Sequence, residues 1–293
     1  MAITRTWTGA VNNDAGNPGN WSPSGAPQSG DTLLGKGTID ISGDVLHGDT
    51  LGGGEFQGWE GTINLSHHAV ANVWVAVPPG LTANIDGTDT LNLTAQTSAP
   101  YLVNVNLADH ANLFGSFDLG TYVAANITGG EDAKYHCTET DILRGASMVV
   151  DADVVGSGKF ILEQGQYRYG PHQASLEFAG SVSRGQTIEV TGTQYGLVSQ
   201  LKIDCPADFQ GTVDLHDASR IDLVGLAQSD SWTYKNDMLS IKAACGKVLD
   251  TLRVESDTSS GSVHGLSVSK TAAGDLLVSP GTDFHGSLGL PTS

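Results

Sequence analysis

Short runs in which every second residue is apolar occur along the whole chain. Examples are TIDISGDVL at 38–46, YLVNVNL at 101–107 and TIEVTG at 187–192. Successive side chains of a β-strand point to opposite faces, so a period of two predicts strands with one buried and one solvated face. Helical spacing of apolar residues is nearly absent. Further alternating runs lie at 61–66, 71–77, 90–95, 147–155, 200–205, 212–215, 220–226, 238–244, 251–256, 265–270 and 275–280. The sequence therefore predicts an all-β fold.

Two all-β architectures fit so many short strands, namely a stack of sandwiches and a β-solenoid. The outward positions of the runs carry Asn, Asp, Thr and Ser, where many sandwiches carry long Lys and Glu side chains. Gly, Asn, Asp, Pro and Ser between the runs supply turns. These features favour a β-solenoid.

One eight-residue pattern occurs twice, as DFQGTVDL at 208–215 and as DFHGSLGL at 283–290. Related stretches lie at 55–65, 113–120 and 176–183. We interpret them as successive uses of one structural part, in which Phe stacks on the next coil and Gly forms a corner. The corner motif then consists of Phe209, Gly211, Phe284 and Gly286.

The N-terminal segment has a different composition from the rest of the chain. Trp7 and Trp21 lie among Gly, Asn and Pro residues that predict turns. The end of a solenoid exposes a strand edge that must be covered to prevent end-to-end growth. We therefore expect residues 1–35 to be a cap or anchor and residues 36–293 to be one continuous solenoid body. A possible internal boundary lies at 226–231.

The segment from Trp7 to Leu33 reads Trp-x-Gly, then Asn-Trp, then Pro-x-x-Gly-Asp. It resembles a module at the start of β-helical repeats in autotransporter-like bacterial surface proteins and in some phage virion proteins. The Phe-x-Gly-Thr-Val-x-Leu stretches resemble coils of pectin-lyase-like β-helices. This resemblance implies a right-handed parallel β-helix used on a cell or virion surface, and it implies no particular reaction. The sequence lacks the barrel translocator of an autotransporter, which favours a virion protein.

The net charge limits the classes of partner. Lys and Arg total 14 against 32 Asp and Glu, so the formal charge of the 293-residue chain is −18. Such an acidic chain is expected to repel nucleic acid. No apolar stretch is long enough for a transmembrane helix, and the N-terminus does not read as a secretory signal, so no membrane insertion is expected. Cys137, Cys205 and Cys245 show no metal-ligand spacing and are expected to be buried thiols, or alternatively to form an intersubunit disulfide.

Candidate sites in the sequence are few. The adjacent pair His67 and His68 would point to opposite faces of a regular strand, and the loop at 84–91 lacks the ligands of a calcium site. Pairs of carboxylates that could cleave polysaccharide are also explained as a solvated outer face. We therefore predict no catalytic residue, no cofactor and no metal. Four aromatic residues could stack on sugar rings or could equally be core or subunit interface, namely Trp59, Trp74, Trp232 and Tyr234.

The leading hypothesis is a structural or adhesive β-solenoid on a larger particle. The expected setting is a phage virion surface, as a capsid decoration, head fibre or tail appendage. Expected partners are capsid or tail proteins, further copies in a homotrimer, and cell-surface glycan. The alternatives are a secreted bacterial surface adhesin and a polysaccharide depolymerase.

Overall fold

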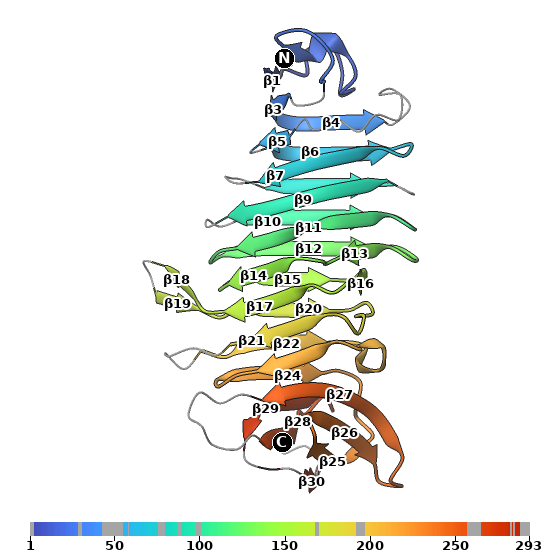
Figure 1. Cartoon of the computed structure of the whole chain (residues 1–293), viewed down its shortest axis with the longest axis vertical. Coiled ribbons are helices and arrows are strands. Elements are labelled where there is room, and N and C mark those ends of the chain that lie inside the picture. Colours follow the sequence, from blue (N-terminus) through green and yellow to red (C-terminus); the bar gives the residue numbers. More distant parts are fainter. Residues whose placement is uncertain are drawn as a thin grey trace. The chain divides into compact units, whose positions relative to one another are not determined.

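The computed structural model describes residues 3–28, 31–42, 55–57, 59–75, 80–86, 89–97, 101–167, 170–191, 197–256, 265–281, 283 and 285–287. In this part the chain contains no α-helix and forms a β-solenoid of about 7 turns built from stacked parallel coils (Figure 1). The predicted β-solenoid is confirmed. Contacts divide the chain into two units, Met1–His136 with Asp151–Asp153 (unit 1) and Cys137–Val150 with Val154–Ser293 (unit 2).

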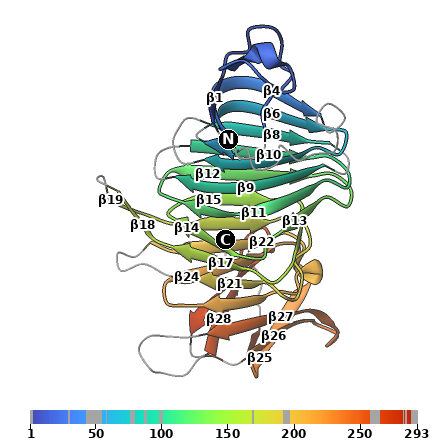
Figure 2. The same cartoon turned by 45° about the horizontal axis from the view of Figure 1, so that its top comes forward.

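Each coil of unit 1 contributes one strand to each of two parallel sheets. In one sheet β4, β6, β8, β10 and β12 pair in this order, as Figure 2 shows. In the other, β1 and β3 are followed by β5, β7, β9, β11 and β13. The elements are β1 (Thr4–Trp7), a 3-10 turn η1 (Pro18–Asn20), β2 (Trp21–Ser22), β3 (Thr32–Leu34), β4 (Lys36–Ser42), β5 (Glu55–Gln57), β6 (Glu60–Ser66), β7 (Val70–Val75), β8 (Leu81–Ile85), β9 (Thr90–Thr97), β10 (Tyr101–Leu107), β11 (Asn112–Leu119), β12 (Val123–Gly129) and β13 (Lys134–His136).

The core of unit 1 consists of aligned rows of apolar side chains. One row runs through Ile39, Ile63, Ala83, Val105 and Ile127, which lie opposite one another in register. None of them exposes more than 1% of its surface. Burying a large aliphatic side chain contributes roughly 1.5–3 kcal/mol, so such rows are the main stabilising term of the stack.

A row of polar side chains runs along the outer face of the same sheet. Asn64 Nδ2 donates to Asp40 Oδ1, Asn84 Nδ2 to Asn64 Oδ1, and Asn106 Nδ2 to Asn84 Oδ1, each over 2.7 Å. Thr128 Oγ1 donates to Asn106 Oδ1 over 3.0 Å. The partners lie 20 to 24 positions apart in the chain, which is one coil. We call this row the amide ladder.

The N-terminal segment packs on the first coils of unit 1. Trp7 meets Trp21 edge-on at 5.0 Å between ring centroids and meets Trp59 at 6.2 Å. All three rings are at most 8% exposed. Residue Asp14 forms a parallel bridge with Asp40, so the segment pairs with the edge strand β4. The capping role of Trp7 and Trp21 stays a prediction.

A buried ion pair fastens the same segment. Arg5 Nε lies 2.6 Å from Asp31 Oδ2, and their side chains are 9% and 2% exposed. Arg5 Nη1 also donates to the backbone oxygens of Pro23 and Gly25, while Asp31 accepts from the backbone nitrogens of Ile3 and Gln28. Both oxygens of Asp31, and Nε and Nη1 of Arg5, therefore have partners, as burial of charge requires.

Unit 2 begins with parallel coils and ends with antiparallel strands. Parallel pairing joins β14, β17, β21 and β23 in one sheet and β15, β20, β22 and β24 in the other. After β24, the strands β25, β26 and β27 form an antiparallel meander, and β29 pairs antiparallel with β24 and β28. The elements are β14 (Thr140–Arg144), β15 (Ser147–Val150), β17 (Lys159–Glu163), β18 (Gly165–Tyr167), β19 (Gly170–His172), β20 (Ser175–Phe178), β21 (Thr187–Val190), β22 (Ser199–Ile203), η2 (Pro206–Asp208), β23 (Thr212–Leu215), β24 (Ser219–Leu223), β25 (Ser229–Lys235), β26 (Met238–Ala243), β27 (Val248–Ser256), β28 (Gly265–Lys270), β29 (Leu276–Gly281) and β30 (His285–Ser287), with β16 (Asp153–Val155) containing residues of both units.

The expectation of uniform coils to the C-terminus is therefore wrong beyond β24. The pairing changes from parallel to antiparallel at the predicted internal boundary of 226–231, between β24 and β25. Both parts nevertheless belong to one compact unit. The strand β27 links them, because it pairs in parallel with β23 and antiparallel with β26.

The two copies of the eight-residue pattern also differ from expectation. Phe209 is 4% exposed and Gly211 precedes β23, so the first copy is a corner followed by a strand. A Cβ on Gly211 would lie 3.2 Å from Gln186 O, so close packing explains this glycine. Gly286, in contrast, lies within β30 and pairs antiparallel with Trp232, while Phe284 lies outside the described residues. The pattern is therefore not one repeated structural part.

Candidate functional site

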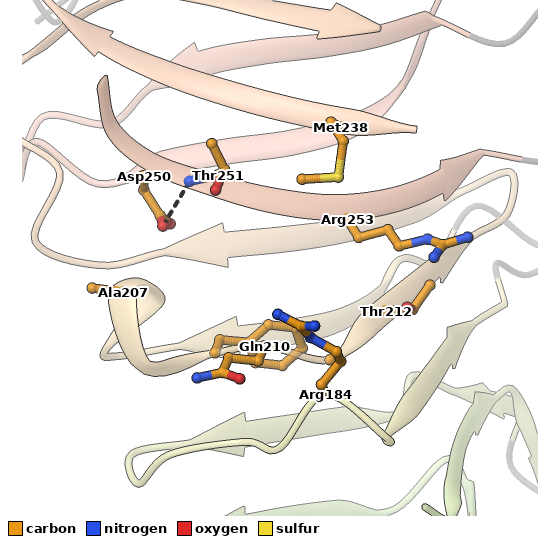
Figure 3. A pocket seen from close by; sticks show the side chains of 10 residues that line it. Arg184, Ala207, Gln210, Thr212, Met238, Asp250, Thr251 and Arg253 are labelled. Carbon is orange, nitrogen blue, oxygen red and sulfur yellow. Dashed lines mark hydrogen bonds between the residues drawn. The ribbon is translucent and has the colours of Figure 1, made fainter. Parts of the chain in front are cut away.

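A pocket opens in unit 2 where two neighbouring strands diverge. β23 and β27 pair only from Thr212 and Arg253 onward. Before that point, the chain that leads into β23 forms η2 and the corner at Phe209, whereas β27 runs alongside β26. The gap between them has a volume of about 470 Å³ and is drawn in Figure 3. The lining residues are Arg184, Ala207, Phe209, Gln210, Gly211, Thr212, Met238, Asp250, Thr251 and Arg253.

Two arginines give the pocket a cationic side. Arg184 stands in the turn before β21 and, among the described residues, has no ion-pair partner. Arg253 Nη2 donates to Glu255 over 2.8 Å, and the Arg253 side chain remains 56% exposed. Both guanidinium groups are therefore accessible in a chain whose formal charge is −18.

Asp250 stands on the other side of the pocket from Arg253 in Figure 3. Its Oδ1 accepts the backbone N–H of Thr251 over 2.8 Å, at the part of β27 that β23 does not reach. Its Oδ2 is buried without a hydrogen-bond partner. Burial raises the pKa of Asp250, and the hydrogen bond from Thr251 opposes that rise.

A row of three carboxylates adjoins the pocket on the same face of unit 2. Glu189, Asp214 and Glu255 lie opposite one another on β21, β23 and β27. We call them the acidic row. His216 Nε2 lies 3.4 Å from Asp214 Oδ2 and 4.0 Å from Glu189 Oε1. Adjacent strands lie about 4.8 Å apart, so the row places neighbouring carboxylates close together.

The pKa values of two members of the acidic row move in opposite directions. The hydrogen bond from Lys159 lowers the pKa of Glu189, despite some burial. Burial raises the pKa of Asp214, and the nearby charges of Glu189 and Glu255 add to the rise, while His216 opposes it. Opposite shifts of two neighbouring carboxyls are a pattern found in acid–base sites.

Three of the four aromatics considered as sugar platforms are buried. Trp59 is 1% exposed, Trp232 is 3% exposed and Tyr234 is 6% exposed, with the Tyr234 hydroxyl donating to Val254 O over 2.8 Å. A ring stacks on a sugar only through an open face, so glycan stacking is wrong for these three and the core alternative holds. The side chain of Trp74 lies outside the described residues.

The remaining candidates behave in different ways. His67 and His68 are exposed and have φ angles of 57° and 63°, so they form a turn and do not continue β6. Cys137 is buried as expected, but Cys205 and Cys245 are exposed. Within the described ranges, no group of three or more His, Cys, Asp or Glu side chains could hold a metal ion.

The helical elements of the described residues are short. None is long and apolar enough to cross a membrane.

The chain matches no known protein-family model, no curated protein and no solved structure. Its fold is therefore the main constraint on function, and one fold can serve many functions.

The pocket and the acidic row were not found from the sequence. Asp214 is one of the outward carboxylates that the sequence explains as a solvated outer face. Its neighbours Glu189 and Glu255 come from distant segments, and only the register of β21, β23 and β27 brings them together. The alternation places Glu189 and Asp214 outward, but it does not give the partner strand.

Proposed function

We propose that this protein is a structural and adhesive β-solenoid displayed on a larger particle, a phage virion, as a capsid decoration, head fibre or tail appendage. Further copies in a homotrimer and the capsid or tail proteins are its proposed partners, and the virion surface is its proposed location. The resemblance of the Trp7–Leu33 segment to virion and surface proteins supports this setting.

The observation that carries the proposal is the amide ladder on the outer face of unit 1. Each Asn in the ladder is both donor and acceptor, so neighbouring coils are joined outside as well as through the backbone and the core. Ladders of this kind restrict sliding and twisting between coils. They also leave a neutral, polar surface that resists association with other proteins. Stiffness and dispersion are properties that a displayed structural protein needs.

The test is to find what carries the chain in its native state. Particles from the source culture are purified by density gradient, and the chain is located with an antibody in electron micrographs. The proposal expects regular labelling of virions and a trimer in light scattering of the purified protein. Labelling of the bacterial envelope alone would support the secreted adhesin, and a monomer would contradict the trimer.

The acidic row favours a second candidate, a polysaccharide depolymerase. Glycoside hydrolysis uses two carboxylates on either side of the scissile bond, one protonated and one ionised. Asp214 and Glu189 lie on adjacent strands, and their pKa values shift in the opposite directions that such a pair needs. This function expects new reducing ends when the protein is incubated with capsular polysaccharide.

Substitutions distinguish this candidate from contaminating activity. Asp214→Asn and Glu189→Gln should each abolish product formation. Asp222→Asn is the matched control, because Asp222 is also a carboxyl whose pKa burial raises but it lies on the other sheet of unit 2. Equal activity of all three variants would reject the acidic row as the catalytic site.

A further inference from the structure

We propose that the pocket of unit 2 binds an acidic saccharide, that is, a sugar bearing a carboxylate. The inference goes beyond the proposed function, because it concerns unit 2 alone and holds whether or not a virion carries the chain. It also specifies the ligand chemistry more closely than the cell-surface glycan expected from the sequence.

The arginines of the pocket select for a carboxylate. A guanidinium presents a planar fork of N–H donors that matches a carboxylate with two parallel hydrogen bonds. Arg184 is exposed at the pocket and has no ion-pair partner among the described residues, so binding need not break an existing pair. Arg253 shares its charge with Glu255 and can supply a second, weaker contact.

The remaining lining suits the body of a sugar ring. Thr212, Thr251 and Gln210 provide hydroxyl and amide groups that both donate and accept hydrogen bonds, as sugar hydroxyls require. The Met238 side chain, which is 39% exposed, provides apolar surface for the C–H face of the ring. This mixture of a few polar groups with apolar walls is typical of small-molecule sites.

The geometry also orients such a ligand. Asp250 and Arg253 are three positions apart on β27, which is about 10 Å along a strand, and Figure 3 shows them on opposite sides of the pocket. A carboxylate is therefore attracted toward the arginines and repelled from the Asp250 end. The volume of about 470 Å³ accommodates one or two sugar rings and not a long polymer segment.

Calorimetric titration of the full chain tests the proposal. The probes are digalacturonate and sialyllactose, which carry carboxylates on different sugars, with cellobiose and lactose as neutral counterparts and inorganic phosphate as a small anion. We expect one or both acidic probes to bind at least about 10-fold more tightly than their neutral counterparts.

Arg184→Gln should weaken binding of the acidic probe by about 10-fold or more, because a charge-assisted hydrogen bond is lost. The matched control is Arg144→Gln, which removes an exposed arginine outside the pocket.

Each other outcome overturns the proposal. Equal affinity for acidic and neutral probes would mean that the arginines do not select. Competition by phosphate at the same concentration as the acidic sugar would assign the pocket to small anions. Unchanged binding by Arg184→Gln, or equal loss in Arg144→Gln, would place the binding site elsewhere. Hydrogen exchange over 205–215 and 248–256 then identifies the region that the ligand protects, and protection elsewhere also counts against the pocket.

Discussion

The two units build parallel coils in the same way but join the outer side chains of neighbouring coils by different chemistry. In unit 1 the amide ladder links five coils through amide and hydroxyl groups, with the carboxylate of Asp40 at its first position. In unit 2 the corresponding contacts are charged. Examples are Lys202 between Glu177 and Asp204, at 2.9 Å from each, and Arg144 beside Glu163 at 2.6 Å.

This difference has physical consequences. Exposed ion pairs contribute little and are screened by salt, whereas amide hydrogen bonds are nearly independent of salt and pH. Beyond Asp40, the ladder also adds no charge to a chain that is already strongly acidic. The amide ladder therefore suits constant stiffness, and the charged face of unit 2 suits recognition. Four predictions test this contrast.

The largest effect is expected at the buried ion pair of Arg5 and Asp31 in the N-terminal segment of unit 1. Arg5→Leu leaves Asp31, which is 2% exposed, without its cation. Breaking a buried pair in this way costs about 3–5 kcal/mol. Urea unfolding should show this loss, and Arg144→Leu in unit 2 should lose no more than ~1 kcal/mol because its pair is exposed. Similar losses in both variants would remove the distinction between buried and exposed pairs.

The pH dependence of the Arg5 pair has a defined sign. Burial by itself would raise the pKa of Asp31, but its hydrogen bonds with Arg5, Ile3 and Gln28 lower it overall. A lowered pKa in the folded state contributes stability above the ordinary carboxyl pKa of about 3.9, and this contribution is lost as the pH falls through the folded value. The deficit of Arg5→Leu relative to wild type should therefore shrink in acid.

The amide ladder is expected to give the second largest effect. Asn84→Ala removes the donor to Asn64 and the acceptor of Asn106, which costs about 1–2 kcal/mol for two hydrogen bonds. The loss should be the same at low salt and in about 1 M NaCl, where exposed charges are screened. Hydrogen exchange should show that this loss of stability is located in β6, β8 and β10. Thr82→Ala, at a neighbouring outward position of β8, is the control, and an equal loss there would show that the ladder adds nothing.

The sequence predicts the parts of this fold that depend on local pattern. The runs at 101–107 and 265–270 coincide with β10 and β28, because burial of one face fixes their alternation. The amide ladder follows from the Asn residues of β6, β8 and β10 once the coil register is known. The stretch at 113–120 is interpreted from the sequence as a Phe–Gly corner, and this is wrong because β11 runs without a break through Phe114 and Gly115.

The failures concern contacts between distant segments. DFHGSLGL has the same local pattern as DFQGTVDL, but β30 pairs antiparallel with β25 whereas β23 continues the parallel coils. No residue within the eight-residue pattern specifies the partner strand. The pocket is missed for the same reason, because it results from how far β23 and β27 run together.

A smaller effect is expected from the charged face of unit 2. Lys202→Met removes contacts to Glu177 and Asp204, and because these side chains are about one-third exposed the loss should be below ~1 kcal/mol. Hydrogen bonds from Lys202 to Glu177 and Asp204 raise the pKa of the lysine. Its contribution is therefore present below the ordinary lysine pKa of about 10.4 and lost only at higher pH. High salt should abolish the difference between variant and wild type, and a deficit that persists in salt would contradict the screening argument.

The smallest effect is expected at Asp250 in the pocket, and its direction is stabilising. Burial raises the pKa of Asp250. The folded state therefore loses stability as the pH rises from about 3.9 through the raised pKa, and at higher pH the destabilisation by the buried charge is complete. Asp250→Asn removes that charge and keeps the oxygen that accepts from Thr251. The variant should gain up to ~1 kcal/mol at neutral pH, because the residue is only partly buried, and nothing near pH 3. Asp217→Asn, at an exposed turn, should change little at either pH. Lower stability of Asp250→Asn than of wild type at pH 7 would contradict this prediction. It would mean that the carboxylate stabilises the folded state and that the cationic side of the pocket extends to Asp250.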